Sequence, residues 1–464
     1  MESSLRLIKP CLDHTSPSHP DSTTPSATEQ MIQSHNRYLL NTYARPPILF
    51  THGTGLSLFD SSDREYLDFT AGIAVTALGH ADAGINAIIA EQSGMISHAS
   101  NVYWNEWAGE LAKALIEGTR QHGGLGLKLG SDGSLGHDGA RGGKVFFSNS
   151  GTEANEGALK FARIHGKGST LGGESSSKAG IVCFSNAFHG RSMGALSVTP
   201  NPKYQAPFSP LIPDVRVGQL NEINEGKMRD LVDDTVCGVI VEPIQGEGGV
   251  ESCRIEWLEM LGRRCREVGA VLIYDEIQCG LFRSGTMWAH STYPTDAQPD
   301  IVTMAKPLAN GFPIGAIMVR DHIAEAILIG SHGTTFGGQP LATRIGTHVL
   351  SRLNEPHFIS HLNDTASHLD KLLERLPKLF PSLIKGPIRG RGLIRGIPFR
   401  TSAAPAELVR MARERGVLLL TAGKDAVRCV PALIVNKEQC DLAVGVMESC
   451  LHLMVSAGLG EDPT

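Results

Sequence analysis

The chain lacks the features that would direct it to a membrane or to nucleic acid. None of its apolar runs approaches the roughly 18 residues that span a bilayer. Its formal net charge is −6, so no basic field attracts a phosphate backbone or an anionic lipid surface. The sequence therefore predicts a soluble protein whose partners include neither a membrane nor a nucleic acid.

The sequence also lacks a cysteine framework. Its nine cysteines are odd in number, and no two of them form a C-x-x-C pair. Five lie in or near apolar segments: Cys183, Cys237, Cys253, Cys265 and Cys279. Buried free thiols in a reducing compartment explain this distribution better than disulfides or a zinc site, so we expect no bound metal.

The first thirty residues carry little that could build a core. Residues 1–30 are rich in Ser, Thr and Pro, which predicts a disordered segment or a cleaved targeting segment. Arg6 and Lys9 stand among apolar residues, as in a mitochondrial presequence. Three acidic residues count against that interpretation: Glu2, Asp13 and Asp21. We expect the mitochondrial matrix, with the cytoplasm as the alternative.

Short apolar runs alternate with helical patterns through the middle of the chain. Helical patterns cover residues 84–96 and 106–117. The apolar runs predict strands over residues 145–148, 180–184, 237–242, 270–274 and 301–304. This alternation indicates a parallel sheet with helices on both faces, and such sheets bind ligands at the carboxyl ends of their strands.

The length of 464 residues favours two domains. A hairpin is predicted over residues 57–69, and the glycine-rich stretches 118–143 and 166–180 are predicted loop insertions. Strands near residues 394–397, 417–420 and 427–430, followed by a helix, indicate a smaller α+β domain. The predicted boundaries are 31–85 for the first part of the small domain, 86–344 for the large domain and 345–464 for the rest of the small domain.

Three segments at predicted strand ends carry groups that could bind a ligand or take part in catalysis. Residues 148–155 follow a strand and open a helix, with Ser150 and Glu153 in capping-box spacing. The free N–H groups of such a helix start, together with the Thr152 hydroxyl, suit a phosphate. A plain helix cap explains the same residues.

The second segment, residues 275–278, ends an apolar strand with two acids and an amide. A buried carboxylate such as that of Asp275 needs a cationic partner, and a protonated pyridine nitrogen is one. A structural salt bridge or a Mg²⁺ ligand remains an alternative.

The third segment brings Lys306 out of a buried strand into a glycine-rich turn. Partial desolvation there would let its amine attack an aldehyde, although most lysines are merely solvated.

Together, a phosphate cradle, an acid for a ring nitrogen and an amine for an aldehyde describe a site for pyridoxal 5′-phosphate (PLP). From about Thr42 to the last helix, the chain resembles the class III aminotransferases of fold type I. The most specific stretches are residues 149–156, 188–191, 241–249, 275–278, 305–306 and 334–338. The resemblance implies an α/β large domain with a mainly parallel seven-stranded sheet and a smaller α+β domain.

The resemblance also implies roles for individual residues. Lys306 would link covalently to the cofactor and act with Asp275 in catalysis. Asp275 would hold the ring nitrogen and Gln278 the phenolic oxygen, while Phe188 would stack on the ring. Gly151 and Thr152 would bind the phosphate, and Thr335 would reach it from the neighbouring subunit of a homodimer with shared sites. The substrate-contacting positions are Arg191, Thr334, Arg428 and Glu247, with Glu247 screening Arg428.

The choice of substrate is the open question within this family. Residues 71–80 and 100–106 resemble most the members that act on N-acetylornithine. Ile73 falls where ornithine-specific members carry a Tyr for a free α-amino group. The expected reaction moves the δ-amino group of N-acetylornithine to 2-oxoglutarate, a step of arginine biosynthesis. Ornithine, 4-aminobutyrate and succinylornithine are the alternative donors. Two departures from the family pattern are Cys279 and Ala83.

Two other classes of protein compete with this interpretation. A nicotinamide-dependent oxidoreductase would need G-x-G-x-x-G, but the glycines at 124, 126 and 130 and at 390, 392 and 396 are spaced G-x-G-x-x-x-G. A catalytically dead relative with a binding role would lack the lysine or the ring-nitrogen acid. This chain keeps both Lys306 and Asp275.

Overall fold

The structure, a computed structural model, describes residues 9–127, 142–168 and 178–459. The chain divides into two compact units: Ala83–Ile359, and Met1–Asp82 together with Ser360–Thr464. Arg6, Gly130 and the greater part of both predicted insertions lie outside the described residues.

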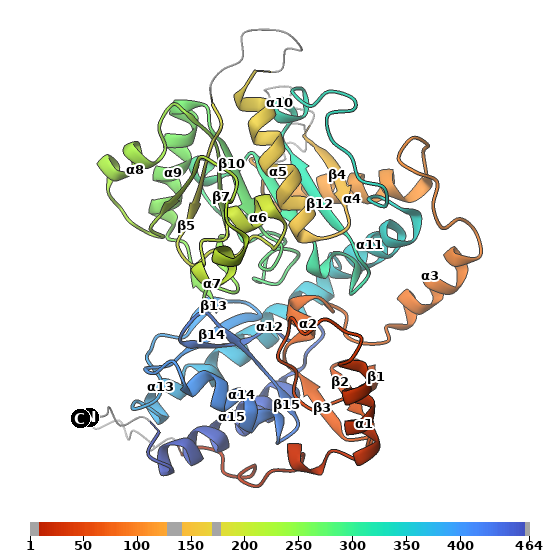
Figure 1. The fold of residues 1–464 in the computed structure, drawn as a ribbon, viewed down its shortest axis with the longest axis vertical. Helices are drawn as coiled ribbons and strands as arrows, with labels where there is room; N and C mark the ends of the chain where they lie inside the picture. Colours follow the sequence, from red (N-terminus) through yellow and green to blue (C-terminus); the bar gives the residue numbers. More distant parts are fainter. Residues whose placement is uncertain (1–8, 128–141, 169–177, 460–464) are drawn as a thin grey trace. The chain divides into compact units, whose positions relative to one another are not determined.

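The unit Ala83–Ile359 is built on a seven-stranded sheet with the order β4-β12-β11-β10-β7-β5-β6 (Figure 1). β10 pairs in parallel with β7 and β11, whereas β12 is antiparallel to β11 and β4. The predicted, mainly parallel seven-stranded sheet is thus confirmed. The strands are β4 (Lys144–Ser148), β5 (Gly180–Phe184), β6 (Val215–Gly218), β7 (Val236–Val241), β10 (Val271–Asp275), β11 (Ile301–Met304) and β12 (Gly315–Val319).

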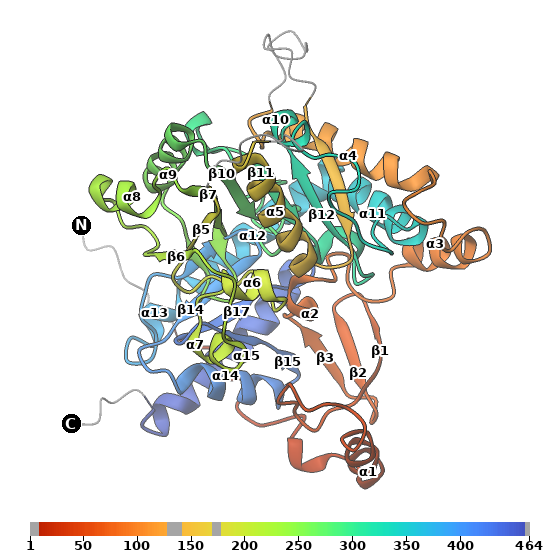
Figure 2. The same ribbon diagram turned by 45° about the horizontal axis from the view of Figure 1, so that its top comes forward.

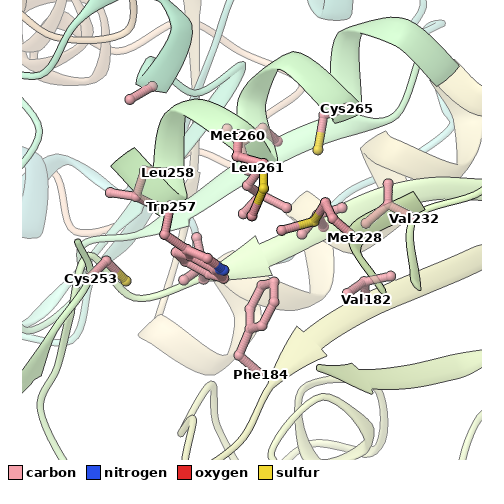
Figure 3. Packing of buried hydrophobic residues seen from close by; sticks show 14 of the residues in the cluster. Val182, Phe184, Met228, Val232, Cys253, Trp257, Leu258, Met260, Leu261 and Cys265 are labelled. Carbon is pink, nitrogen blue, oxygen red and sulfur yellow. The ribbon is translucent and has the colours of Figure 1, made fainter. Parts of the chain in front are cut away.

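Alternate side chains of the central strands build a core on each face of this sheet, because successive strand residues point to opposite faces. On one face, Val239 and Leu272 share a cluster with Trp257 of α9 (Ile255–Val268) and Met228 of α8 (Glu225–Leu231). Figure 3 shows Trp257 at the centre of this cluster, beside Phe184. The opposite face carries a second cluster, which includes Ile240, Ile273, Ala158 and Leu159. Ala158 and Leu159 belong to α5 (Gly151–Gly166).

Three further helices of this unit are α3 (Ala83–Ser93), α4 (Glu106–His122) and α11 (Pro340–Leu353). α4 continues five residues beyond its predicted end at Glu117, so the predicted loop insertion is wrong for residues 118–122. The extension is stabilised by a buried bond in which Trp288 Nε1 donates to Thr119 Oγ1 at 3.0 Å. Long-range packing of this kind overrides the low helix propensity of Gly118.

The other unit contains two four-stranded sheets. The first has the order β1-β2-β3-β15 and the second β13-β14-β17-β16. The strands of the first are β1 (Phe50–Thr54), β2 (Ser57–Asp60), β3 (Glu65–Asp68) and β15 (Val417–Leu418). Those of the second are β13 (Arg389–Arg391), β14 (Ile394–Pro398), β16 (Leu420–Ala422) and β17 (Ala426–Cys429). The helices of this unit include α12 (Pro356–Leu373), which begins just before the unit boundary, α14 (Ala404–Arg413) and α15 (Lys437–Ser456).

Residues 9–30 are folded as part of this unit, although the sequence predicts that they are disordered or removed. The backbone N–H of Cys11 donates to Glu448 Oε2 of α15 at 2.7 Å, and Arg413 pairs with Asp21 at 2.6 Å. A helix, α1 (Ser26–His35), follows. The local sequence could not predict these contacts, because each partner lies some 390 residues or more away along the chain. Removal of the first residues stays a prediction.

Candidate active site

One cavity of about 240 Å³ opens at the carboxyl end of the parallel strands. It lies wholly within the unit Ala83–Ile359. Seven residues singled out from the sequence line it: Gly151, Thr152, Phe188, Arg191, Asp275, Gln278 and Lys306. The described structure therefore brings together the three segments that the sequence placed at separate strand ends.

The cavity receives the N-terminus of α5, which follows β4 after a two-residue turn. Ser150 caps this helix by accepting a hydrogen bond from Glu153 N at 3.3 Å. The reciprocal bond of a capping box goes elsewhere, since Glu153 Oε2 accepts from the N–H of Asn149 at 2.8 Å. The helix start thus presents its positive dipole end and the first backbone N–H groups to the cavity, which suits an anion.

The turn before α6 (Met193–Ser197) closes over this helix start. Thr152 Oγ1 lies 2.7 Å from Ser192 Oγ and accepts a hydrogen bond from Ser192 N. Gly190 is required here, because a Cβ on it would lie 2.2 Å from Thr152 Oγ1 and its φ is +136°. The hydroxyl of Thr152 is therefore fixed at the mouth of the cavity.

The Asp275 carboxylate is buried at the end of β10 and is held from three directions. Its Oδ2 lies 2.8 Å from His189 Nδ1 and accepts from Asn155 Nδ2, also at 2.8 Å. Its Oδ1 accepts from the N–H of Ile277 at 3.0 Å. Thr303 donates to Asn155 Oδ1 at 2.8 Å and so orients the Asn155 amide. A carboxylate fixed in this way, and lining a cavity, is suited to a cationic ligand atom.

Two further cavity residues occupy the ends of neighbouring strands. Lys306 begins a short 3₁₀ helix (Lys306–Ala309) directly after β11, and its side chain is half-buried. Gln278 lies against Gly246, where a Cβ would stand 2.2 Å from the Gln278 Cδ atom. The close approach explains why glycine occupies position 246.

Glu242 also lines the cavity, although the sequence analysis assigned it no role. It follows β7, and its carboxylate accepts hydrogen bonds from Phe188 N and Gly246 N, both at 2.9 Å. Burial raises the pKa of Glu242 to about 7. The nearby Asp275 also raises this pKa, whereas the interaction with His189 lowers it. Its position at a strand end, next to residues 275–278 in the sheet, was the signal that could have identified it.

The remaining predicted site residues do not line the cavity. Glu247 is half-buried between β8 (Ile244–Gln245) and β9 (Glu251–Ser252). Thr334 Oγ1 accepts from Asn149 Nδ2 at 2.9 Å, and Thr335 is exposed beside it. Arg428 is buried on β17 of the other unit. The predicted pairing of Glu247 with Arg428 stays a prediction.

The structure also shows where Cys279, which departs from the family pattern, and the glycines of the competing dinucleotide motif lie. Cys279 is buried with its sulfur 3.9 Å from the Asp275 carbonyl oxygen, and burial raises its pKa well above the usual value. All nine cysteines are free thiols, and the five that the sequence placed in apolar segments are buried, as predicted. Cys429, Cys440 and Cys450 are buried as well. Gly390 lies within β13 and Gly392 in the turn that joins it to β14. The two strands form an antiparallel hairpin and not a strand-to-helix turn, which excludes a dinucleotide loop there.

The described residues show neither a metal-binding cluster nor a membrane-spanning helix. Within residues 9–127, 142–168 and 178–459, no group of three or more His, Cys, Asp or Glu side chains is arranged to hold a metal ion. No helix in the same part of the chain is long and apolar enough to cross a membrane.

Comparison with known proteins defines the class. Residues 39–451 match the family described as aminotransferase class-III, and the chain belongs to this family. It is 48% identical over 440 residues to the mitochondrial acetylornithine aminotransferase of Neurospora crassa, covering 95% of this chain and 91% of that protein. It is also 42% identical to the mitochondrial acetylornithine aminotransferase of Saccharomyces cerevisiae, covering 93% of this chain and 98% of that protein.

Solved structures agree with this membership. The N-acetylornithine aminotransferase of Stenotrophomonas maltophilia matches with a TM-score of 0.72 at 29% identity, covering 91% of this chain and 99% of that one. The ornithine aminotransferase of Toxoplasma gondii, whose active site holds PLP at partial occupancy, matches with a TM-score of 0.80 at 26% identity. That match covers 94% of this chain and 97% of the other. Membership implies PLP as cofactor and an amino donor and a keto acid as substrates.

The raised pKa of Glu242 predicts a pH dependence of stability. Between about pH 4.5 and about pH 7, the folded protein retains a proton that the unfolded chain releases, so stability falls as pH rises through this window. In Glu242→Gln, melting temperatures of the cofactor-free protein between about pH 5 and about pH 7.5 should fall less steeply than in wild type.

The exposed Glu256 provides the matched control, because Glu256→Gln removes an equal charge without altering a buried group. It should keep the wild-type slope. An unchanged slope in Glu242→Gln would show that Glu242 is ionised in the folded protein throughout this range.

Proposed function

We propose that this chain is a PLP-dependent acetylornithine aminotransferase of the mitochondrial matrix. It transfers the δ-amino group of N-acetylornithine to 2-oxoglutarate, giving N-acetylglutamate 5-semialdehyde and glutamate, in arginine biosynthesis. The observation that carries the proposal is the meeting of Asp275, Lys306 and the α5 N-terminus around one cavity. The names of the relatives support the substrate and the compartment.

The cavity residues fit PLP group by group. The α5 N-terminus and the Thr152 hydroxyl match the phosphate, and Gly151 keeps that end open, because a Cβ on it would stand 2.8 Å from Ile277. The buried Asp275 carboxylate matches a protonated ring nitrogen, and the Phe188 ring offers a face for stacking. Gln278 is the amide for the phenolic oxygen and Lys306 the amine for the aldehyde.

When bound, PLP accepts the electron pair released at the substrate carbon and stores the amino group between two half-reactions. Lys306 would carry out the proton transfers. Its Nζ would take the proton from the δ-carbon of the donor and hold it for the later transfer. Asp275 would keep the ring nitrogen protonated, and the His189 and Asn155 contacts hold its carboxylate in place.

Arg191 and Arg428 would divide the carboxylates of the two substrates. Arg191 is exposed at the cavity and would bind the distal carboxylate, with Thr334 as a further proposed contact of the substrate. Arg428 would bind the α-carboxylate of glutamate as a two-hydrogen-bond fork, with Glu247 pairing with it while N-acetylornithine is bound. Ile73 falls where ornithine-specific members carry a Tyr and would offer no polar partner to a free α-amino group, which favours an acylated donor over ornithine.

The active unit would be a homodimer. Apolar side chains stand exposed in the unit Ala83–Ile359 around Thr335, and Trp104 is 99% exposed. Asn101 Nδ2 donates to the Thr334 and Gly337 carbonyls and ties this segment to the Thr335 loop. A surface of this kind marks an interface, and a second copy would cover it while Thr335 reaches the phosphate of the other site. The exposed apolar residues are Val102, Tyr103, Trp104, Ile329 and Phe336.

Lys306→Ala tests the assignment of the reaction. Steady-state rates should be measured with N-acetylornithine, ornithine and 4-aminobutyrate, each with 2-oxoglutarate. N-acetylornithine should be the best donor for wild type. The variant should lose at least about a thousandfold in kcat with that donor, because it lacks the amine that moves the proton. Lys113→Ala, which removes an exposed lysine of α4, should retain wild-type rates. Near-normal turnover without Lys306 would contradict the assignment.

Shared sites predict recovery of activity in mixed dimers. Lys306→Ala subunits and Thr335→Ala subunits should each be weakly active alone. A heterodimer contains one site with an intact Lys306 and an intact Thr335, so mixing should restore up to about half of the wild-type activity per mixed dimer. Subunit exchange is verified by differently tagged chains. Verified exchange without recovery would favour self-contained protomers.

A further inference from the structure

Arg191 is stacked on an aromatic ring that the proposed function leaves without a role. Its Cζ atom lies 3.5 Å from the ring centroid of Tyr204 and 5.5 Å from that of Phe188. The two rings stand almost perpendicular, at 85°, with their centroids 6.3 Å apart. The guanidinium is therefore placed by Tyr204, at the side of the cavity that Phe188 also lines.

Tyr204 is itself fixed by the short helix that carries it. This helix, α7 (Pro202–Gln205), is capped by Asn201, which accepts from Lys203 N at 3.1 Å. Gln205 Nε2 donates to the carbonyls of Leu196 and Ser197, at 3.0 and 3.2 Å, and so fastens α7 to α6. Both views show α6 and α7 side by side (Figures 1 and 2). The ring is thus a rigid platform.

The edge of the Arg191 guanidinium remains available for a ligand. Among the described residues of the unit Ala83–Ile359, no Asp or Glu side chain forms an ion pair with it. Stacking occupies the flat face of a guanidinium and leaves the N–H groups at its edge, which bind a carboxylate as a fork. An exposed arginine otherwise loses considerable side-chain freedom when it binds, and a platform reduces that cost.

We propose that Tyr204 is a positioning residue that determines specificity for carboxylate-bearing donors by holding Arg191 ready to bind the distal carboxylate. This inference rests on the proposed function for the identity of the donor. A cation–aromatic contact at an exposed site changes affinity by roughly two- to fivefold, and more where water is excluded. The ring face, not the phenolic hydroxyl, supplies the effect.

The test compares two donors that differ only in the carboxylate. Holoenzyme carrying Tyr204→Leu is reacted in single turnovers with N-acetylornithine and with N-acetyl-1,4-diaminobutane, its decarboxylated analogue. The apparent dissociation constant for N-acetylornithine should rise by about threefold to tenfold, with a limiting rate within about twofold of wild type. The constant for the analogue, taken from competitive inhibition where its reaction is slow, should stay within about twofold. Tyr204→Phe keeps the ring and should match wild type with both donors.

Two outcomes overturn the proposal. Unchanged affinity for N-acetylornithine in Tyr204→Leu means that the stacking does not assist binding. Equal losses with both donors mean that Tyr204 supports the fold of the site and not carboxylate recognition. The proposed function fails separately, if wild type does not react with N-acetylornithine but reacts with ornithine. The effect of Tyr204→Leu on the dissociation constants of ornithine and of 1,4-diaminobutane is then compared in the same way. A larger rise for ornithine supports the role of Tyr204, and equal rises overturn it.

Discussion

The buried carboxylate of Asp275 is the constraint on which the rest of the site depends. It stands at the end of β10, a strand buried along its whole length, where an uncompensated charge is costly. The protein holds it with His189, Asn155 and the Ile277 N–H, and Thr303 in turn orients Asn155. This network joins β10, β11, α5 and the segment after β5, so the same bonds that stabilise the charge also fix the position of the cavity.

Close backbone approaches explain the glycines around this carboxylate. Gly151 and Gly190 stand where any Cβ would meet Ile277 or Thr152, and Gly246 stands where one would meet Gln278. Each therefore lets a polar group or a backbone N–H reach the cavity. Glu242 accepts hydrogen bonds from the two loops that contain Phe188 and Gly246. It therefore links the side of the cavity formed by Phe188 to the segment that leads to Glu247. Hydrogen bonds therefore link several of the segments that line the cavity.

Local sequence pattern predicted the parts of the fold that local chemistry determines. Strands β5 and β11 were predicted with their observed bounds because they are continuous apolar runs. β12 was not predicted, since its antiparallel pairing depends on strands that lie apart from it in sequence. β6 was also missed, because it is only partly buried. Part of the site follows the same division: Asp275 and Lys306 were identified from strand ends, and Glu242 could have been identified in the same way. The stacking of Tyr204 on Arg191 instead depends on how α7 packs on α6, which the local pattern does not predict.

We propose that Asp275 keeps the ring nitrogen of the bound cofactor protonated. The most direct measurement is the ¹⁵N chemical shift of ring-labelled PLP bound to the wild-type protein. Wild type should show the shift of a protonated pyridine from about pH 6 to about pH 9, because the adjacent carboxylate strongly favours the charged ring. In Asp275→Asn the bound ring should show the shift of the neutral form near pH 7. A neutral ring in wild type, or a shift that titrates as in the free cofactor, would contradict the account.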